Sequence, residues 1–428
     1  MRDKLGFGMA TALVVGNIIG SGVYLIPTSL APYGVNSLSA WLFTAAGAVV
    51  LALVFARLSA ALPAEGGLYA YTRAAFGELA GFVVAWGYWV SIWVGNAAIA
   101  TAGVSYTSVV APWIVEVPGA SVVVTLAIVW LLTLVNCLGV RAAGWVQVVT
   151  TLLKLVPLVG IGIVGFGFLG GDLVGAGVVG MPLGLDATTA AATLTLWALL
   201  GLESATVPAD KVHDPARTIP RATVAGTLAS ALVCALASSV VLALIPAPAL
   251  AASNAPFADA AALLFGAGAA PVVAVFAAIS AYGALNGWIL LQGELPSALA
   301  RDGLFPRAFA RLSRRGAPVA ALVSSSVLVS GLVLMNFHKG LVEVFTFMIL
   351  LSTTAVLVAY LASSLSLLVL LRRGRVASRH AAWLAVLGVL GALYSLWAIA
   401  GAGRTAVQWG AVLILAALPV YALLRARG

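Results

Sequence analysis

The chain has 428 residues, of which 63% are hydrophobic and only 8% are charged. Soluble domains carry about 25% charged residues, so this composition indicates a polytopic α-helical membrane protein. The continuous apolar runs argue against a β-barrel, whose segments alternate. The formal net charge of +9 comes from cations in short loops, so we expect no nucleic-acid partner. Cys137 and Cys234 fall inside apolar runs, which favours buried thiols over a disulfide or a metal site.

Apolar runs separated by short polar breaks predict twelve membrane-spanning helices, each long enough to cross the hydrocarbon core. Their approximate ranges are 8–31, 37–61, 79–110, 119–139, 145–168, 187–209, 220–245, 271–300, 317–337, 341–370, 381–400 and 405–424. The longer connections are candidates for short surface helices or gates. They lie at about 62–78, 169–186 and 246–270.

The cations of the loops predict the orientation of the chain in the membrane. Of the 22 Lys and Arg residues, 19 fall on one side of the predicted spans and only Lys339 and Arg404 fall on the other, while Lys154 lies inside a span. Positively charged loops remain on the cytoplasmic side. We therefore expect a multi-pass protein of the cell (inner) membrane with both termini in the cytoplasm.

The first span is interrupted halfway by the sequence GNIIGSG at residues 16–22. Glycines and small polar residues at this depth favour an unwound segment, and unwound backbone is tolerated in a membrane only beside a cavity or ligand. The N–H groups of Gly20, Ser21 and Gly22 would begin a half-helix whose dipole favours an anion such as a carboxylate. The alternative is a packing face of small residues, since Gly16 and Gly20 are four residues apart.

The sixth span carries a second interruption, WALLGLESA at residues 197–205, with Gly201 at its centre. Carbonyl groups freed near Trp197 and Leu200 would accept hydrogen bonds from an ammonium group, so the two breaks together would bind a zwitterion. Glu203 is an ionisable residue deep in the membrane, which marks a functional site by default. Burial disfavours its charged form, so its protonation could be coupled to transport. A structural carboxylate is the alternative.

The two interrupted spans are separated by a full set of five helices, so the two halves would have opposite orientations. Paired broken helices at matching positions indicate a transporter with an inverted repeat and a binding site at the midplane. We therefore expect one polytopic domain over residues 1–428. Repeat one would cover about 8–168, repeat two about 187–370, and two additional helices about 381–424.

Lys154 lies nine residues into the fifth span, too deep for its ammonium group to reach the interface easily. It must be neutral, paired, or hydrogen-bonded to carbonyls freed at the first break. There it could replace a sodium ion or exchange a proton itself, and both roles stay open. Other spans carry side chains that suit a site for stacking and hydrogen bonding, although each taken alone could be structural. These are Tyr88, Trp93, Asn96, Asn286, Trp288, Ser352, Thr353 and Thr354.

Residues 16–22 also resemble the first-span signature of the amino acid–polyamine–organocation (APC) superfamily, and three loop motifs agree with it. The motifs are PAEGGLYAY at 63–71, DPARTIPRA at 214–222 and ARDGLFP at 300–306. The resemblance covers essentially the whole chain, and the chain looks most like the bacterial arginine/agmatine antiporters. It implies the five-plus-five inverted-repeat fold of the leucine transporter, with spans one and six discontinuous. Members of the family often form dimers, so a homodimer is one option.

The resemblance further implies roles for individual residues. Ser21 and Gly22 would bind the substrate carboxylate. The carbonyls of Ile18, Trp197 and Leu200 would bind the α-amino group. The two breaks that supply these groups also contain Asn17, Gly20 and Gly201. A guanidinium group would be contacted by Asn96, by Ser352 and by the main chain at Ser91 and Ile92. Trp288 would stack on the substrate side chain. An inner gate that responds to pH would be formed by Tyr88, Glu203 and Tyr360.

Two positions depart from the antiporter pattern. Ile92 stands where the antiporter has a cysteine, and Lys154 stands where it has a small apolar residue. Lys154 instead resembles the fifth-span lysine of sodium-independent and proton-coupled amino acid permeases. These departures leave amino acid transport as the expected function and open the choice of substrate.

We therefore expect a sodium-independent secondary transporter that works by alternating access and exchanges a cationic amino acid for an amine. Its partners would be that small-molecule substrate and the lipid bilayer, with no cofactor and no enzymatic activity. A proton-coupled permease for neutral or broad-range α-amino acids is the alternative. A membrane-embedded lipid phosphotransferase is a remote one, because Asp210 and Asp214 could hold magnesium but no phosphate-binding loop accompanies them.

Overall fold

The computed structural model describes residues 6–63, 67–138, 140–172, 182–206, 212–336, 339–376 and 380–426. Within these ranges, the side chains of Ser21, residues 140–149 and 151–152, and Ala426 are not described. Several sequence-based predictions therefore lie outside the described residues. They concern the side chain of Ser21, residues 64–66 of the first loop motif, residues 173–181 of the connection at 169–186, and the acidic pair through Asp210.

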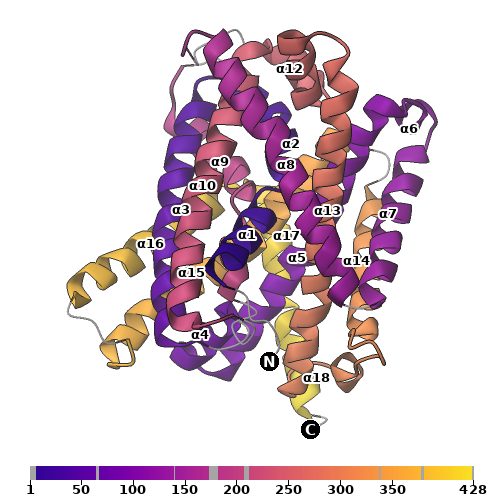
Figure 1. Ribbon diagram of the computed structural model, residues 1–428. Coiled ribbons are helices and arrows are strands. Elements are labelled where there is room, and N and C mark those ends of the chain that lie inside the picture. The colour runs from indigo at the N-terminus through magenta and orange to yellow at the C-terminus, as the bar shows by residue number, and fades with distance from the viewer. Residues whose placement is uncertain are drawn as a thin grey trace.

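The described residues form a bundle of α-helices joined by turns (Figure 1). The helices are α1 (Phe7–Ile18), α2 (Ser21–Leu30), α3 (Asn36–Ala61), α4 (Leu68–Phe76), α5 (Glu78–Val110), α6 (Trp113–Glu116), α7 (Ala120–Cys137), α8 (Val140–Phe168), α9 (Leu185–Trp197), α10 (Pro215–Leu244), α11 (Ala247–Ala252), α12 (Pro256–Phe265), α13 (Ala269–Arg301), α14 (Val319–Met335), α15 (Leu341–Arg372), α16 (Ala381–Gly401), α17 (Arg404–Leu415) and α18 (Ala417–Ala426).

Nine helical segments of the described residues are long and apolar enough to cross a membrane. Two of these segments combine shorter helices, α1 with α2 and α17 with α18. The other three predicted spans contain helices that are shorter over their described apolar parts: residues 153–168 of α8, the thirteen residues of α9, and α14. The chain is therefore an integral membrane protein, and a helix occupies each of the twelve predicted ranges.

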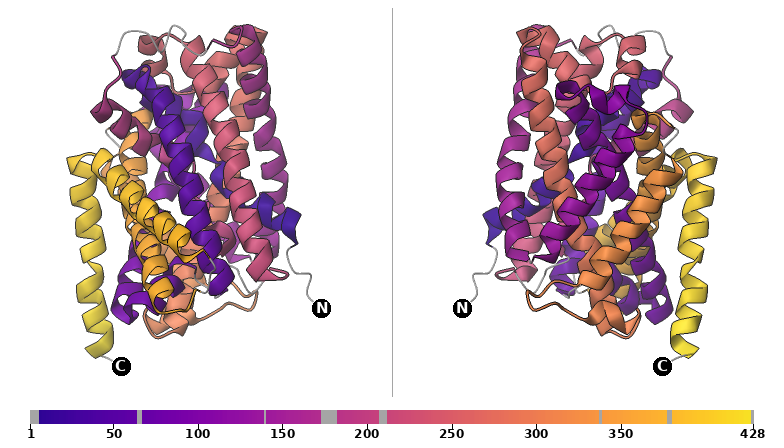
Figure 2. Two further views of the ribbon diagram at one scale, coloured as in Figure 1. Left: turned by 90° about the vertical axis from the view of Figure 1, so that its left-hand side faces the viewer. Right: turned by 90° about the vertical axis from the view of Figure 1, so that its right-hand side faces the viewer.

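The interior of the bundle is built around α5, which packs against α13 and α15, while α3 packs against α10. Of the residues in the apolar 18-residue window of α5, 89% are buried, whereas in the corresponding window of the α17–α18 segment only 17% are buried. The latter stands at the outer edge of the bundle, where its apolar side chains meet the surroundings (Figure 2). This difference in burial places the polar residues of α5, and not those of α17 or α18, in a position to serve an internal site.

Short helices occupy the connections in which they were expected. The connection at 62–78 contains α4, and the connection at 246–270 contains α11 and α12. The latter lies at one end of the bundle, while α1 begins and α18 ends toward the other (Figure 1). Hydrogen bonds fix the loop between α11 and α12 to the bundle, since Thr28 Oγ1 donates to the Ser253 carbonyl at 3.0 Å and Ser105 Oγ to the Asn254 carbonyl at 2.6 Å.

Candidate functional site

The first span is interrupted where its sequence predicts. Helix α1 ends at Ile18 and α2 begins at Ser21, while Gly20 between them has φ −122° and ψ −140° and is not helical. The first N–H groups of a helix lack partners within that helix, so the first turn of α2 presents main-chain donors at this point. The break thus places amides of one half-helix beside carbonyls of the other.

The second interruption follows α9, which ends at Trp197 and continues as turns and one 3₁₀ turn at Ser204–Thr206. Gly201 has φ +105°, a conformation that residues with a Cβ rarely adopt. A Cβ at this position would lie 3.1 Å from the carbonyl carbon of Asn17. Both the positive φ and the close approach to Asn17 therefore require glycine here. Because Gly201 lacks a side chain, the two breaks can lie against each other.

A cavity of about 460 Å³ adjoins both breaks, and α5, α13 and α15 complete its wall. Most of the predicted site residues line it: Asn17, Ile18, Gly20, Gly22, Tyr88, Ser91, Ile92, Trp197, Leu200, Glu203, Trp288 and Ser352. Four further lining residues carry no signal that would distinguish them from ordinary apolar packing in a sequence: Gly95, Ile99, Ala284 and Val356.

The other predicted site residues lie behind this lining. Gly201 lies against Asn17, Tyr360 donates to Glu203 in the second break, and Lys154 donates to the Gly16 carbonyl at the first. Asn96 turns its amide toward Gln292 on α13. All four residues therefore lie near the two breaks, but none of them lines the cavity.

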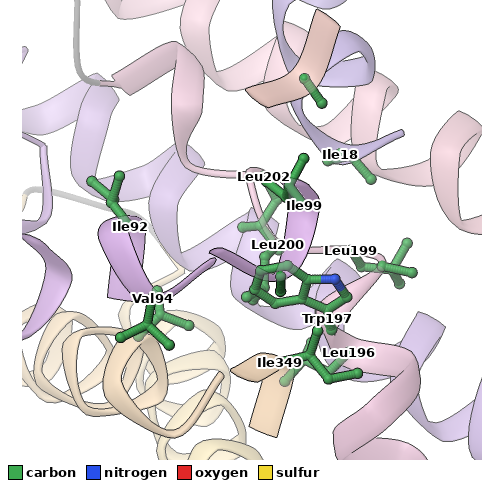
Figure 3. Close-up of a cluster of buried hydrophobic side chains, with 14 of the residues drawn as sticks. Ile18, Ile92, Val94, Ile99, Leu196, Trp197, Leu199, Leu200, Leu202 and Ile349 are labelled. Atoms are coloured by element: carbon green, nitrogen blue, oxygen red, sulfur yellow. The ribbon is translucent and has the colours of Figure 1, made fainter. Parts of the chain in front are cut away.

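Trp197 forms one apolar wall of the cavity, between glycines of two different helices. A Cβ on Gly22 would come within 2.9 Å of Cδ1 of the indole, and a Cβ on Gly95 within 2.8 Å of its opposite edge. Figure 3 shows the ring beside Leu200, with Ile99 of α5 nearby. The absence of side chains at these two glycines thus leaves the space that the indole ring occupies.

The carboxylate of Glu203 is fully buried and accepts three hydrogen bonds. Tyr88 donates to Oε1 at 2.8 Å, Tyr360 donates to Oε2 at 2.5 Å, and the Gly201 N–H donates to Oε2 at 3.2 Å. Buried carboxylates are stable only when such donors satisfy them. The three side chains of the predicted gate therefore form one hydrogen-bonded group, which joins α5 and α15 to the second break.

Ser352 of α15 also contacts α5 at the cavity wall. Its Oγ donates to the Ser91 carbonyl at 2.7 Å, and Ser91 Oγ donates to the Tyr88 carbonyl at the same distance. The Ser91 carbonyl is one of the groups expected to meet a guanidinium, so in this conformation Ser352 occupies that acceptor. Trp288 lies on the cavity wall contributed by α13 and is only partly buried.

Lys154 is fully buried and joins α8 to both halves of the first span. Its Nζ donates to the Gly16 carbonyl in the last turn of α1 at 2.6 Å. The main-chain carbonyl of Lys154 accepts from the Tyr24 hydroxyl of α2 at 2.7 Å. Of the options left open for this lysine, the structure therefore shows a hydrogen bond to a carbonyl at the first break.

Comparison with known proteins agrees with this architecture. The family model for amino acid permeases matches residues 5–423. A putrescine transporter of Haemophilus influenzae is 31% identical over 421 residues, covering 98% of this chain and 96% of that protein. A cadaverine/lysine antiporter of Escherichia coli is 33% identical over 355 residues, with coverage of 78% and 74%. A putative arginine/ornithine antiporter of Bacillus subtilis is 31% identical over 393 residues, with coverage of 85% and 83%.

A solved structure supports the same fold. The manganese transporter of Eremococcus coleocola aligns with a TM-score of 0.57 at 14% identity, covering 98% of this chain and 94% of that one. At this identity the likeness concerns the fold alone. The match of the family model over nearly the whole sequence, together with relatives above 30% identity, is decisive: the chain belongs to the amino acid permease family of the APC superfamily.

Proposed function

We propose that the protein exchanges a cationic amino acid for an amine across the inner membrane, without sodium, with arginine and agmatine as representative substrates. The observation that carries the proposal is the pair of helix breaks that meet at one cavity. Relatives named as a putrescine transporter and as a cadaverine/lysine and an arginine/ornithine antiporter support exchange of amino acids and amines.

The two breaks offer complementary groups to a zwitterion. The N-terminus of α2, with Gly20, Ser21 and Gly22, would bind the carboxylate, because free N–H groups and the helix dipole both favour an anion. The carbonyls of Ile18, Trp197 and Leu200 would accept hydrogen bonds from the α-amino group. These groups belong to different segments, so binding a substrate would hold the segments together.

The chemistry of the cavity wall supports a cationic substrate. Among the described residues, Glu203 is the one carboxylic acid side chain that lines the cavity. Trp197 and Trp288 offer aromatic faces, which attract ammonium and guanidinium groups. Ile92, Ile99 and Val356 make part of the wall apolar, which supports the second candidate, a proton-coupled permease for neutral or broad-range α-amino acids.

Alternating access in this proposal uses twelve spans arranged as two inverted repeats, residues 8–168 and 187–370, with both termini cytoplasmic. The packing supports the symmetry: the second helix of each half (α3 and α10) and the third (α5 and α13) pack against each other, as members of a two-fold pair would. Helices 381–424 lie outside the repeat. Lys154 would supply a fixed positive charge at the first break, in the position of a sodium ion.

The proposal is tested with purified protein in liposomes loaded with unlabelled arginine. Uptake of labelled arginine, blocked by external agmatine and independent of sodium, is the expected result. Uptake of alanine or leucine driven by a pH gradient would instead support the permease. A sodium requirement would contradict the role given to Lys154, and failure of every amino acid and amine tested would overturn both candidates.

The hydrogen bonds of Glu203 lead to a prediction about the gate. Tyr360→Phe is expected to lower the exchange rate by roughly tenfold to a hundredfold, since a hydrogen bond to a charged group contributes about 1.5–3 kcal/mol. The KM for the substrate should change little, because Tyr360 does not line the cavity. Tyr282→Phe is the matched control, as that hydroxyl pairs with Thr107 at 2.6 Å outside the cavity wall. Equal rates for the two variants in proteoliposomes would contradict the gate.

A further inference from the structure

Behind the cavity wall, four polar side chains from four helices form a continuous hydrogen-bonded chain. Asn96 of α5 donates from Nδ2 to Gln292 Oε1 of α13 at 2.7 Å. Gln292 Nε2 donates to Ser326 Oγ of α14 at 2.9 Å, and Ser326 Oγ lies 2.7 Å from Thr133 Oγ1 of α7. All four residues are buried, at 2% exposure or less. We call this set the amide relay.

The direction of every bond in the amide relay follows from its far end. The Thr133 hydroxyl donates its single hydrogen to the Val129 carbonyl at 2.7 Å, and a carbonyl can only accept. Ser326 must therefore be the donor to Thr133, so its oxygen is the acceptor for Gln292 Nε2. That leaves Gln292 Oε1 facing Asn96, which must then present its Nδ2 group. A backbone carbonyl on α7 thus sets the orientation of the carboxamide on α5.

The consequence is an acceptor without a donor beside the cavity. Asn96 Oδ1 is buried and has no hydrogen-bond partner among the described residues. Burying such an oxygen unpaired is unfavourable, so the site gains by receiving a donor there. Asn96 follows Gly95 directly and lies one helical turn after Ile92, and both of those residues line the cavity. Asn96 therefore lies directly behind the part of the cavity wall that α5 contributes.

We propose that Gln292 is a positioning residue that holds Asn96 with its oxygen available to a donor group of the substrate. The amide relay would thereby favour a guanidinium group, which presents N–H donors on every edge, over the ureido group of the same shape, in which an accepting oxygen replaces one of the terminal NH2 groups. This inference rests on the proposed exchange of cationic substrates. It adds the residues that would recognise the terminal group of the substrate side chain.

The test compares arginine with citrulline, its ureido isostere, as competitors of labelled arginine uptake in proteoliposomes. The wild-type protein is expected to prefer arginine. Ser326→Ala removes the acceptor that orients Gln292, so the arginine-to-citrulline preference should fall by about tenfold, as expected for one hydrogen bond. The neighbouring Ser325→Ala is the matched control, because Ser325 Oγ donates to the Gln292 main-chain carbonyl at 3.1 Å and leaves the relay intact.

Two further variants separate positioning from a merely structural role. Gln292→Leu should lose the preference, whereas Gln292→Glu, which keeps an acceptor facing Asn96, should retain it. Slower uptake with an unchanged preference in Ser326→Ala and Gln292→Leu would overturn the inference while leaving the exchange function in place. Absence of competition by arginine in the wild-type protein would overturn both.

Discussion

Replacing Lys154 by methionine is expected to reduce exchange by roughly tenfold to a hundredfold. The substitution keeps an unbranched side chain but removes the donor that contacts the Gly16 carbonyl at 2.6 Å. A hydrogen bond from a charged donor contributes about 1.5–3 kcal/mol, and the carbonyl would remain buried without it. Because the bond joins α8 to the last turn of α1, its loss should disturb the break itself. Exchange rates in proteoliposomes, normalised to inserted protein, give the measurement.

An arginine at the same position distinguishes two roles of the lysine. Lys154→Arg retains a permanent positive charge, so a fixed cation would be partly preserved and exchange should exceed that of the methionine variant. A lysine that must release its proton would be replaced by a group that cannot, and both variants would then be equally inactive. Wild-type exchange in Lys154→Met would contradict either role and assign the residue to packing.

The sequence predicted the broken spans because their signal is local. Three glycines within residues 16–22, and Gly201 with Glu203 in the sixth span, have no use in a continuous apolar helix. The end of the helix before the second break followed from the same signal and not from hydropathy: α9 stops at Trp197, where the predicted interruption at 197–205 begins, inside the hydrophobic run that extends to residue 209. Hydropathy cannot detect this end, since the residues after it are as apolar as those before it.

The cavity wall was predictable only in part, for a physical reason. Polar and aromatic members such as Ser352, Trp288 and Glu203 stand out in apolar helices, and resemblance to the APC superfamily added the main-chain groups of Ser91 and Ile92. Gly95 and Val356 do not stand out, because a residue of this kind is equally suited to lipid contact, packing or a cavity. Their role becomes visible only when the helices are placed together.

The amide relay shows a second limit. Gln292 lies 196 residues after Asn96 in the sequence and 34 before Ser326. Nothing in the sequence distinguishes these three from the other polar residues of their helices, and a polar residue within a span often ties two helices together. Asn286, which accepts from Asn136 at 3.0 Å, is an example of that ordinary role. The donors and acceptors of the relay can be assigned only from the distances, because only the distances connect the Asn96 carboxamide to the Val129 carbonyl.

Gly22→Val is expected to abolish exchange, with a loss of about a hundredfold or more. Its Cβ would lie 2.9 Å from Trp197 Cδ1 and 3.1 Å from the main-chain Cα of Ala198, so relief requires movement of the second break as well as of the ring. Overpacking of this kind costs about 1–3 kcal/mol, and displacement of Trp197 would narrow the cavity. Both effects act on the groups proposed to bind the substrate, so affinity should fall together with the rate.

The matched control is Gly331→Val, in α14 and also within the membrane-spanning bundle. An added Cβ there meets no atom within 4 Å, so this variant should insert, fold and exchange like the wild-type protein. Stabilisation by arginine in a thermal unfolding assay supplies a second measurement, which Gly22→Val should lose and Gly331→Val should keep. Full exchange in Gly22→Val would mean that the two breaks can separate without loss of function, and the substrate site would then have to lie elsewhere in the bundle.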